Sequence, residues 1–347
     1  MMRVYSAIYL LLSASALVAC SPPPSPEPAA TPEAAPATPA EVAPSASLRG
    51  ASSYTPYDAL SMLWVRGDDS RSIVWTSSGG ASGRLLVSQG DERPDFVFCT
   101  QGVVAGLAAR GKSPVIIASV HVADDVILPV FRSPRRPLAG SRSVYIPRSS
   151  IEYAFDQLLE SEGVERGAVT VPSVEKPGFG TIVGMLRKPG EDKDALDFAI
   201  LVDPFITNLM TERPGEYEIG PSGLYDMHYS VVVLEEDLKE RRPAYLQLLR
   251  EMIATSARME AFSDEEFQQE VWGRKADGEP ERLPPMMTYS RKGAGLQLHP
   301  ARVRARLGKE IEYLTTKYPG DLARPDDIDS LVDESLLTEL AVDRVHN

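Results

Sequence analysis

The chain has 347 residues, of which 43% are hydrophobic and 7% aromatic, and its formal net charge is −13. These values describe an average soluble core, large enough for one domain or for two lobes of ordinary size. The acidity argues against a nucleic-acid partner, because phosphate binding requires a basic surface. The chain has only two cysteines, Cys20 and Cys99. Since Cys20 is assigned below to lipidation, no internal disulfide is expected.

The N-terminus combines a short basic start at Arg3 with an apolar run from Val4 to Ala19. This run is too short, and too rich in Ser and Ala, for a bilayer-spanning helix of about 20 residues. It fits the hydrophobic region of a signal peptide. The run closes with Leu-Val-Ala-Cys at residues 17–20, which resembles the lipobox of bacterial lipoproteins. The resemblance implies cleavage after Ala19 and lipidation, including palmitate, of Cys20; the alternative is an ordinary signal peptide with a chance cysteine.

A segment rich in Pro, Ala, Ser, Thr and Glu follows, from Ser21 to about Ser47. It has almost nothing to bury, so we expect an extended tether. Together with the elements below, it predicts five segments of the chain. They are a lipoprotein signal peptide over 1–19, a Pro/Ala-rich tether over 20–46, the first part of lobe 1 over 47–140, lobe 2 over 141–228, and a return to lobe 1 with C-terminal helices over 229–347.

Strands and helices alternate through the first lobe. Strands are predicted over 47–51, 72–75, 95–99 and 114–120, with helices over 57–65, 80–88 and 102–110 between them. The strands are continuous apolar runs, each followed by a helix, which is typical of a parallel sheet covered on both faces. The fold class is therefore α/β.

The second lobe is predicted to begin with a strand over 143–147. A helix over 150–162 follows, and strands over 168–171 and 197–202 flank a helix over 179–187. The chain then returns through a strand over 228–234, a helix over 243–262, a capping box at 263–266 and a helix from Pro300. We expect the crossings between the lobes, which would act as hinges, near 138–143 and 225–229.

This order resembles the substrate-binding proteins of ABC importers in the nitrate, sulfonate, taurine and thiamine-precursor group. The resemblance covers nearly all of 47–347 and is carried by the stretches 76–80, 95–102, 143–150, 199–205 and 328–337. It implies the periplasmic binding protein-like II fold, with two α/β lobes and a ligand cleft between them. The segment after Trp64 is shorter than the family pattern, and no cysteine cluster matches the one that carries chemistry in the thiamine-precursor synthase branch.

The predicted ligand-binding residues follow strand ends, where helix N-termini offer unpaired N–H groups. They are Ser53, Tyr54 and Thr55; Ser77, Ser78 and Gly79; Thr100 and Gln101; Arg148, Ser149 and Ser150; and Asp203. Hydroxyl and N–H donors with Arg148 favour a small anion, whereas Asp203 favours an amine. Helix capping alone explains about half of these residues. The charge of the ligand therefore stays open.

Other apparent motifs lead to no catalytic prediction. Residues 106–113 fit the P-loop pattern, but their first half belongs to the predicted helix over 102–110 and a strand follows from Pro114, which is the reverse of the required order. The four histidines show no metal-ligand spacing, and Cys99 is expected to be a small buried residue. We expect no catalytic residue, no metal and no cofactor.

The sequence thus predicts a monomeric, non-enzymatic lipoprotein of the bacterial cell envelope that faces the periplasm. It would capture a small organic molecule by closure of its lobes and deliver it to an ABC permease of the inner membrane. The alternative is an envelope sensor or interaction lipoprotein on the same fold without transport; an enzyme on this scaffold is a further alternative. The residue after Cys20 is Ser21 and not the Asp that favours inner-membrane retention, so the membrane that holds the anchor stays open.

Overall fold

The structure is a computed structural model that describes residues 48–53, 59–66, 72–76, 79–175, 177–203, 205–272 and 294–345. All of them belong to one compact unit, Val42–Asn347. The predicted signal peptide and tether lie outside the described residues, as do Tyr54, Thr55, Ser77 and Ser78 of the predicted site. Within the described ranges, none of the helices has the length and apolar character that a membrane span requires.

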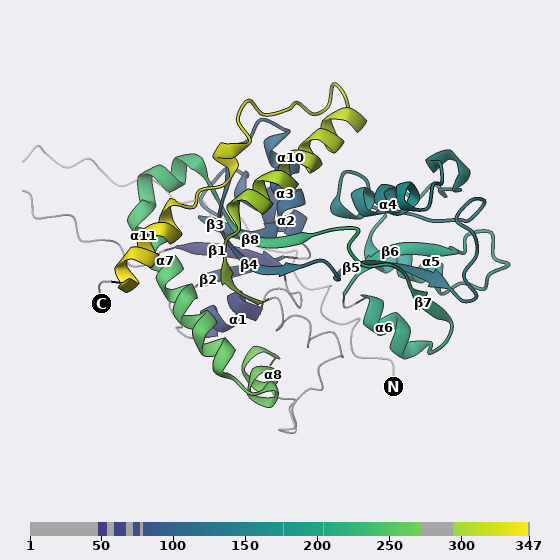
Figure 1. Cartoon of the computed structure of the whole chain (residues 1–347), viewed down its shortest axis with the longest axis horizontal. Coiled ribbons are helices and arrows are strands. Elements are labelled where there is room, and N and C mark those ends of the chain that lie inside the picture. Colours follow the sequence, from purple (N-terminus) through teal and green to yellow (C-terminus); the bar gives the residue numbers. More distant parts are fainter. Residues whose placement is uncertain are drawn as a thin grey trace, which may run out of the picture. The chain divides into compact units, whose positions relative to one another are not determined.

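The larger sheet has six strands in the order β2-β1-β3-β8-β4-β9 (Figure 1). Their bounds are β1 Arg49–Ser53, β2 Ser72–Thr76, β3 Phe96–Thr100, β4 Pro114–Ala123, β8 Met227–Leu234 and β9 Ala294–Gln297. β1 pairs in parallel with β2 and β3, as predicted. β8 is antiparallel to both of its neighbours, and β9 is antiparallel to β4. The prediction of a parallel sheet is wrong for the pairs that involve β8 and β9, because an apolar run indicates burial on both faces but not strand direction.

The smaller sheet has three antiparallel strands, in the order β6-β5-β7. They are β5 Ile127–Arg132, β6 Phe198–Val202 and β7 Tyr217–Ile219. The strands predicted over 143–147 and 168–171 are wrong: an isolated bridge joins Arg142 to Thr170, and a short 3-10 helix, η3, spans Arg166–Ala168. Sequence analysis missed β5, which contains Pro129. Proline is unusual in a central strand, and here its carbonyl accepts a bond from the backbone of Gly220.

The chain crosses between the two sheets twice. We call the part built on the six-stranded sheet the large lobe and the part built on the three-stranded sheet the small lobe. The first crossing joins β4 to β5 over 124–126, before the boundary expected at 141 and before the hinge expected near 138–143. The second joins β7 to β8 over 220–226, next to the predicted position.

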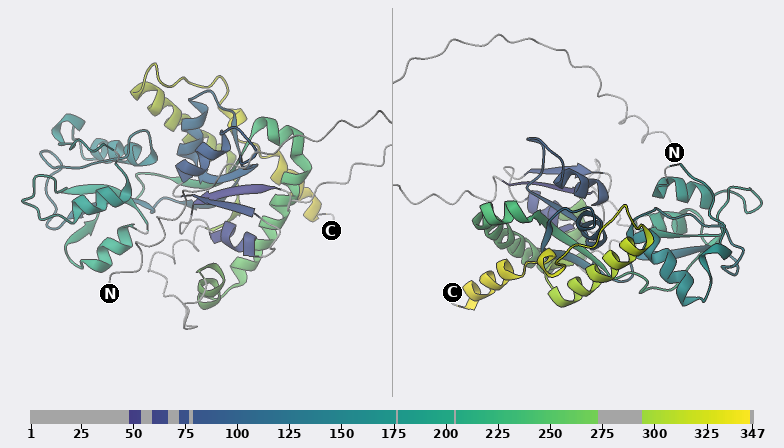
Figure 2. Two further views of the ribbon diagram at one scale, coloured as in Figure 1. Left: turned by 180° about the vertical axis from the view of Figure 1, so that it is seen from behind. Right: turned by 90° about the horizontal axis from the view of Figure 1, so that it is seen from above.

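Helices cover both faces of each sheet (Figures 1 and 2). The large lobe has α1 Ala59–Arg66, α2 Gly79–Leu86, α3 Gln101–Ala108, α7 Glu235–Ala261, α8 Asp264–Trp272, α10 Pro300–Lys317, a 3-10 helix η4 Asp329–Leu331, and α11 Ser335–Val345. The small lobe has α4 Ser150–Ser161, α5 Phe179–Leu186 and α6 Phe205–Glu212. α7 begins eight residues before the predicted Pro243, and its backbone is kinked at Arg241. α10 packs on α3, so it belongs to the large lobe.

Alternating residues of the small sheet pack on its opposite faces, as a period of two requires. Phe131 stacks on Phe198, and Phe198 stacks on Phe155 of α4, with centroid distances of 5.6 and 5.8 Å. Ala199 and Leu201 of β6, whose side chains point to the opposite face from Phe198, pack with α5 and α6 in a separate cluster. The small sheet is thus a buried layer, and α4 is held firmly on one face of it.

Candidate functional site

In the large lobe, predicted site residues gather around Tyr229 of β8. Ser53 ends β1 and is buried, and its hydroxyl lies 2.9 Å from that of Tyr229. Thr100 ends β3 directly opposite Tyr229 in the strand pairing. Gly79 begins α2, and a Cβ added there would lie 3.8 Å from the Tyr229 ring. The structure therefore brings Ser53, Gly79 and Thr100 together, as the strand-end argument predicts.

Gln101 has a different position from the one expected for a ligand-binding residue. It is fully buried at the start of α3. Its side-chain amide donates to the carbonyl of Asp226 at 2.6 Å and accepts from the N–H of His228 at 2.8 Å. Both polar atoms therefore bind backbone at the second crossing. Gln101 fixes the start of β8 to the start of α3, and its role in ligand binding stays a prediction.

The small-lobe residues Arg148 and Ser149 are engaged with the protein itself. Ser149 caps α4, accepting from the N–H groups of Ile151 and Glu152 at 3.2 and 3.5 Å. The Arg148 guanidinium is ion-paired with Asp321 and lies 4.6 Å from the centroid of the Tyr318 ring. Both partners belong to the segment that follows α10. The anion-binding role predicted for Arg148 would require the loss of these contacts.

Asp203 follows β6 and is 1% exposed. One carboxyl oxygen accepts from the N–H and the hydroxyl of Thr207, at 3.1 and 3.2 Å, and so binds the first turn of α6. The other oxygen is buried without a partner among the described residues. Burial, with a smaller contribution from Asp125 at the first crossing, raises the pKa of Asp203 to about 6 against the opposing effect of the Thr207 hydrogen bonds. This carboxyl group has an open acceptor position.

Sequence analysis missed a cluster of polar side chains at the start of α3. A Cβ added to Gly102 would lie 2.6 Å from Ser150 Oγ, 2.7 Å from Glu310 Oε2 and 3.0 Å from Tyr225 Oη. These atoms come from α4, from α10 and from the second crossing. Glycine is required here because any side chain would displace one of the three groups. Of the predicted residues, Ser150 joins this cluster, and the side chain of Gln101 contacts its carboxyl group, Glu310.

Glu310 is the buried carboxyl of that cluster, with 3% exposure. Burial raises its pKa to about 7, although Arg306, Tyr225 and Gln101 act in the opposite direction. The sequence contained one signal for it: Arg306, Glu310, Tyr313 and Lys317 recur at helical spacing beside the apolar face of α10. Because α4 lies some 150 residues earlier in the chain, the sequence did not show what this polar stripe faces.

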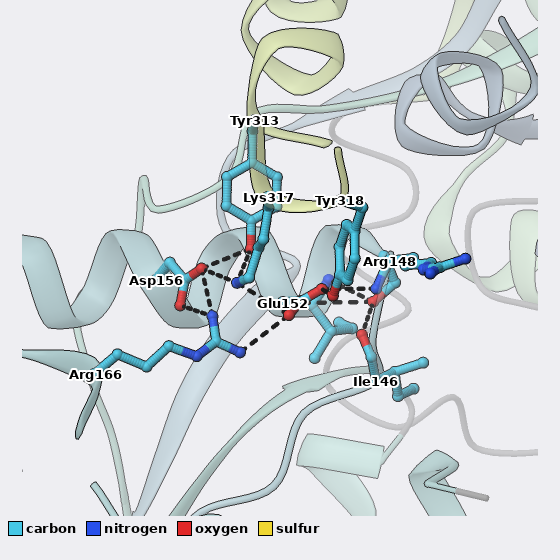
Figure 3. A network of polar contacts seen from close by, with 10 residues as sticks. Ile146, Arg148, Glu152, Asp156, Arg166, Tyr313, Lys317 and Tyr318 are labelled. Atoms are coloured by element: carbon cyan, nitrogen blue, oxygen red, sulfur yellow. Dashed lines mark hydrogen bonds and ion pairs between the residues drawn. The ribbon is translucent and has the colours of Figure 1, made fainter. Parts of the chain in front are cut away.

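The C-terminal end of the polar stripe on α10 meets α4 through charged groups (Figure 3). The carboxylate of Glu152 is 1% exposed and accepts from the N–H of Arg148 at 2.7 Å and from Tyr318 at 2.6 Å. It also lies 3.0 Å from Lys317 and 3.0 Å from Arg166. Burial would raise the pKa of Glu152, but these hydrogen bonds and Lys317 together lower it.

Asp156, one turn further along α4, repeats the pattern. It accepts from Tyr313 at 2.6 Å and is ion-paired with Lys317 and Arg166 (Figure 3). We call the contacts of Glu152 and Asp156 with Tyr313, Lys317 and Tyr318 the α4–α10 bridge. The bridge joins the small lobe to the large lobe by partly buried ion pairs and hydrogen bonds.

The motifs rejected from the sequence have the expected structural setting. α3 ends at Ala108, inside the P-loop-like stretch, Gly111 follows in a left-handed conformation at φ +71°, and β4 begins at Pro114. Cys99 is fully buried, which raises the pKa of its thiol and disfavours the nucleophilic thiolate. Among the described residues, no group of three or more His, Cys, Asp or Glu side chains is placed to hold a metal ion.

Two surface cavities lie elsewhere in the large lobe. One of about 700 Å³ is lined by Arg304 and residues between Ser330 and Glu339. The other, of about 450 Å³, lies beside Lys112 and Arg324. Neither is lined by a predicted site residue.

Two α/β lobes joined by two crossings, with a six-stranded mixed sheet in one of them, form the fold of periplasmic binding proteins. The structure is similar to the aliphatic sulphonate-binding protein SsuA from Escherichia coli, with a TM-score of 0.63 and 13% identity over 79% of this chain and 94% of that one. The alkanesulfonate-binding protein SsuA from Xanthomonas axonopodis pv. citri, bound to MOPS, gives 0.63 and 14% over 83% and 98%. The nitrate-binding protein NrtA from Synechocystis gives 0.60 and 11% over 85% and 88%. No protein-family model matches the sequence, and no curated protein matches it either.

Proposed function

We propose that the chain is a membrane-anchored solute-binding protein of an ABC importer, which holds a small organic molecule between its lobes and delivers it to a permease. The observation that carries the proposal is the convergence of Ser53, Gly79 and Thr100 at strand ends, on a fold shared with sulfonate- and nitrate-binding proteins. In open α/β sheets, ligands bind beyond the carboxyl ends of strands. Binding and lobe movement, without covalent chemistry, make up the mechanism.

The lipidated Cys20 and the tether over 20–46 would keep the binding lobes near a membrane. A flexible tether of about 27 residues spans on the order of 30 Å, and a fully extended one about 80 Å. This length permits contact with a permease in the same membrane. Replacement of Cys20 by Ser, followed by palmitate labelling and separation of the two membranes, tests the anchor and its location; an unchanged membrane fraction would contradict it.

A second function, an envelope sensor or interaction lipoprotein, is supported by the α4–α10 bridge. The bridge connects the lobes through the protein's own side chains, whereas a transport protein must release its solute by moving its lobes apart. A sensor needs only a small change in the same contacts. The presence of adjacent permease and ATPase genes favours transport, and an adjacent kinase gene favours sensing.

Thermal unfolding with a panel of solutes tests the binding role shared by both functions. A solute present at one hundred times its Kd stabilises the folded chain by about 2.7 kcal/mol. The panel comprises sulfonates, nitrogen heterocycles, amino-acid-like compounds and envelope lipids. We expect at least one class to raise Tm. No change across the panel would argue against solute binding.

A further inference from the structure

Arg306 of α10 lies in a corner formed by two tyrosine rings. Its guanidinium carbon is 4.4 Å from the ring centroid of Tyr153, on α4, and 4.5 Å from that of Tyr225, on the second crossing. The rings are 6.2 Å apart and inclined by 71°. A cation within about 6 Å of an aromatic ring is attracted by it, most strongly where water is excluded. The Arg306 side chain is only 12% exposed, so this attraction acts in a nearly dry place.

Glu310 completes the surroundings of this cation. Arg306 Nε donates to Glu310 Oε1 at 3.2 Å, and the carboxyl is buried at the start of α3. Two aromatic rings and one carboxyl group are the features that recognise an organic cation. They come from both lobes and from a crossing, so a cation held here contacts both lobes at once.

Not every donor of the Arg306 guanidinium is paired in this place. Arg306 Nη2 is buried without a hydrogen-bond partner among the described residues. Tyr225 Oη, by contrast, lies beside Ser150 and Glu310, which can accept a hydrogen bond from it or donate one to it. Buried polar groups are normally paired, and leaving them unpaired is unfavourable. A solute cation whose donors were all paired in this place would avoid that cost and would therefore compete with Arg306.

We propose that Tyr153, Tyr225 and Glu310 form a binding site for an organic cation, and that Arg306 is its built-in occupant when no solute is bound. The class of solute is one with a guanidinium or ammonium group, which would replace Arg306 and free α10 from α4. The solute class rests on the proposed function, whereas the occupancy by Arg306 rests on the contacts alone. The site has the opposite preference to the anion site predicted at Arg148.

Chemical rescue with methylguanidinium tests the proposal. The variant is Arg306→Ala, and Lys309→Ala is the matched control, because Lys309 lies on the same helix, is exposed and carries the same charge. We expect Arg306→Ala to lower Tm by about 5 °C or more, and millimolar methylguanidinium to restore part of the loss. The unsubstituted chain and Lys309→Ala should gain less stability from the probe than Arg306→Ala, because in both of them the probe must first displace Arg306. An equal response of Arg306→Ala and Lys309→Ala would overturn the proposal.

Two further measurements keep the outcome decisive. If Arg306→Ala does not fold, Arg306→Gln, which keeps a donor toward Glu310, takes its place with the same expected rescue and the same contrary result. The solute panel separates the two proposals. An anionic solute that stabilises the unsubstituted chain would support solute binding and overturn the cation site, whereas rescue without any stabilising solute would support the site and contradict a binding role.

Discussion

The replacement Glu152→Gln tests the α4–α10 bridge most sharply. It preserves the shape of the side chain but removes the charge that faces Lys317 and Arg166 at 3.0 Å each. Breaking a buried ion pair from one side costs about 3–5 kcal/mol. The cations are 23% and 32% exposed and both keep Asp156, so solvent and the second carboxylate reduce the cost to about 2–3 kcal/mol. This corresponds to a fall in Tm of about 4–8 °C.

The assay is thermal unfolding at neutral pH, with Glu160→Gln as control. Glu160 lies on the same helix but is exposed, so its replacement should change stability by no more than about 0.5 kcal/mol. Acidification gives a second check. The pKa of Glu152 is lowered in the folded chain, so its contribution is present above the ordinary value of 4.5 and is lost as the pH falls below it. Glu152→Gln should lose less stability over that range. Equal Tm values for the two variants would refute the structural role of the bridge.

Four other substitutions have defined outcomes. Gly102→Ala places a methyl group against three polar atoms and should destabilise the fold by about 1–3 kcal/mol in urea unfolding. Its control, Gly184→Ala, has open space around it inside α5 and should stabilise the fold by up to about 1 kcal/mol. Equal effects of the two variants would contradict the crowding at the start of α3. Ser149→Ala should cost about 1 kcal/mol in the same assay, through loss of the α4 cap, and an unchanged midpoint would count against that cap. The pKa of Asp203 is raised to about 6 in the folded protein, so the neutral carboxyl stabilises the fold below the ordinary pKa of 3.8, and this stabilisation is lost as the pH rises through 6. The variant Asp203→Asn should therefore flatten the dependence of Tm on pH between about 4 and 6. An unchanged profile would argue against the burial of this carboxyl.

Much of the helical structure was accessible from the sequence, because its signals are local. α4 and α5 begin at the predicted residues, and the cap of α4 is Ser149, within the predicted polar stretch from Arg148 to Ser150. Caps and apolar periodicity act within a few residues, so no distant contact is needed to locate them. The first three strands followed from the same kind of pattern, and their parallel pairing followed from the helices predicted between them.

The errors have long-range causes. β8 returns from the small lobe antiparallel to β3 and β4, and an apolar run contains no information on direction. β5 contains Pro129, which interrupts the usual pattern of a central strand. The charged stripe of α10 gave rise to no prediction, because its contacts with α4 arise only when the lobes come together. For the same reason the sequence assigned Arg148 to a ligand, whereas the structure pairs it with Asp321.

A native mass spectrum of the full chain purified from its own membranes tests the central claim most directly. The account predicts a one-to-one complex with a small organic molecule, which dissociates on unfolding and raises Tm when added back to the stripped protein. A chain that carries no small molecule, and whose Tm no member of the solute panel changes, would contradict the claim that these two lobes bind a solute.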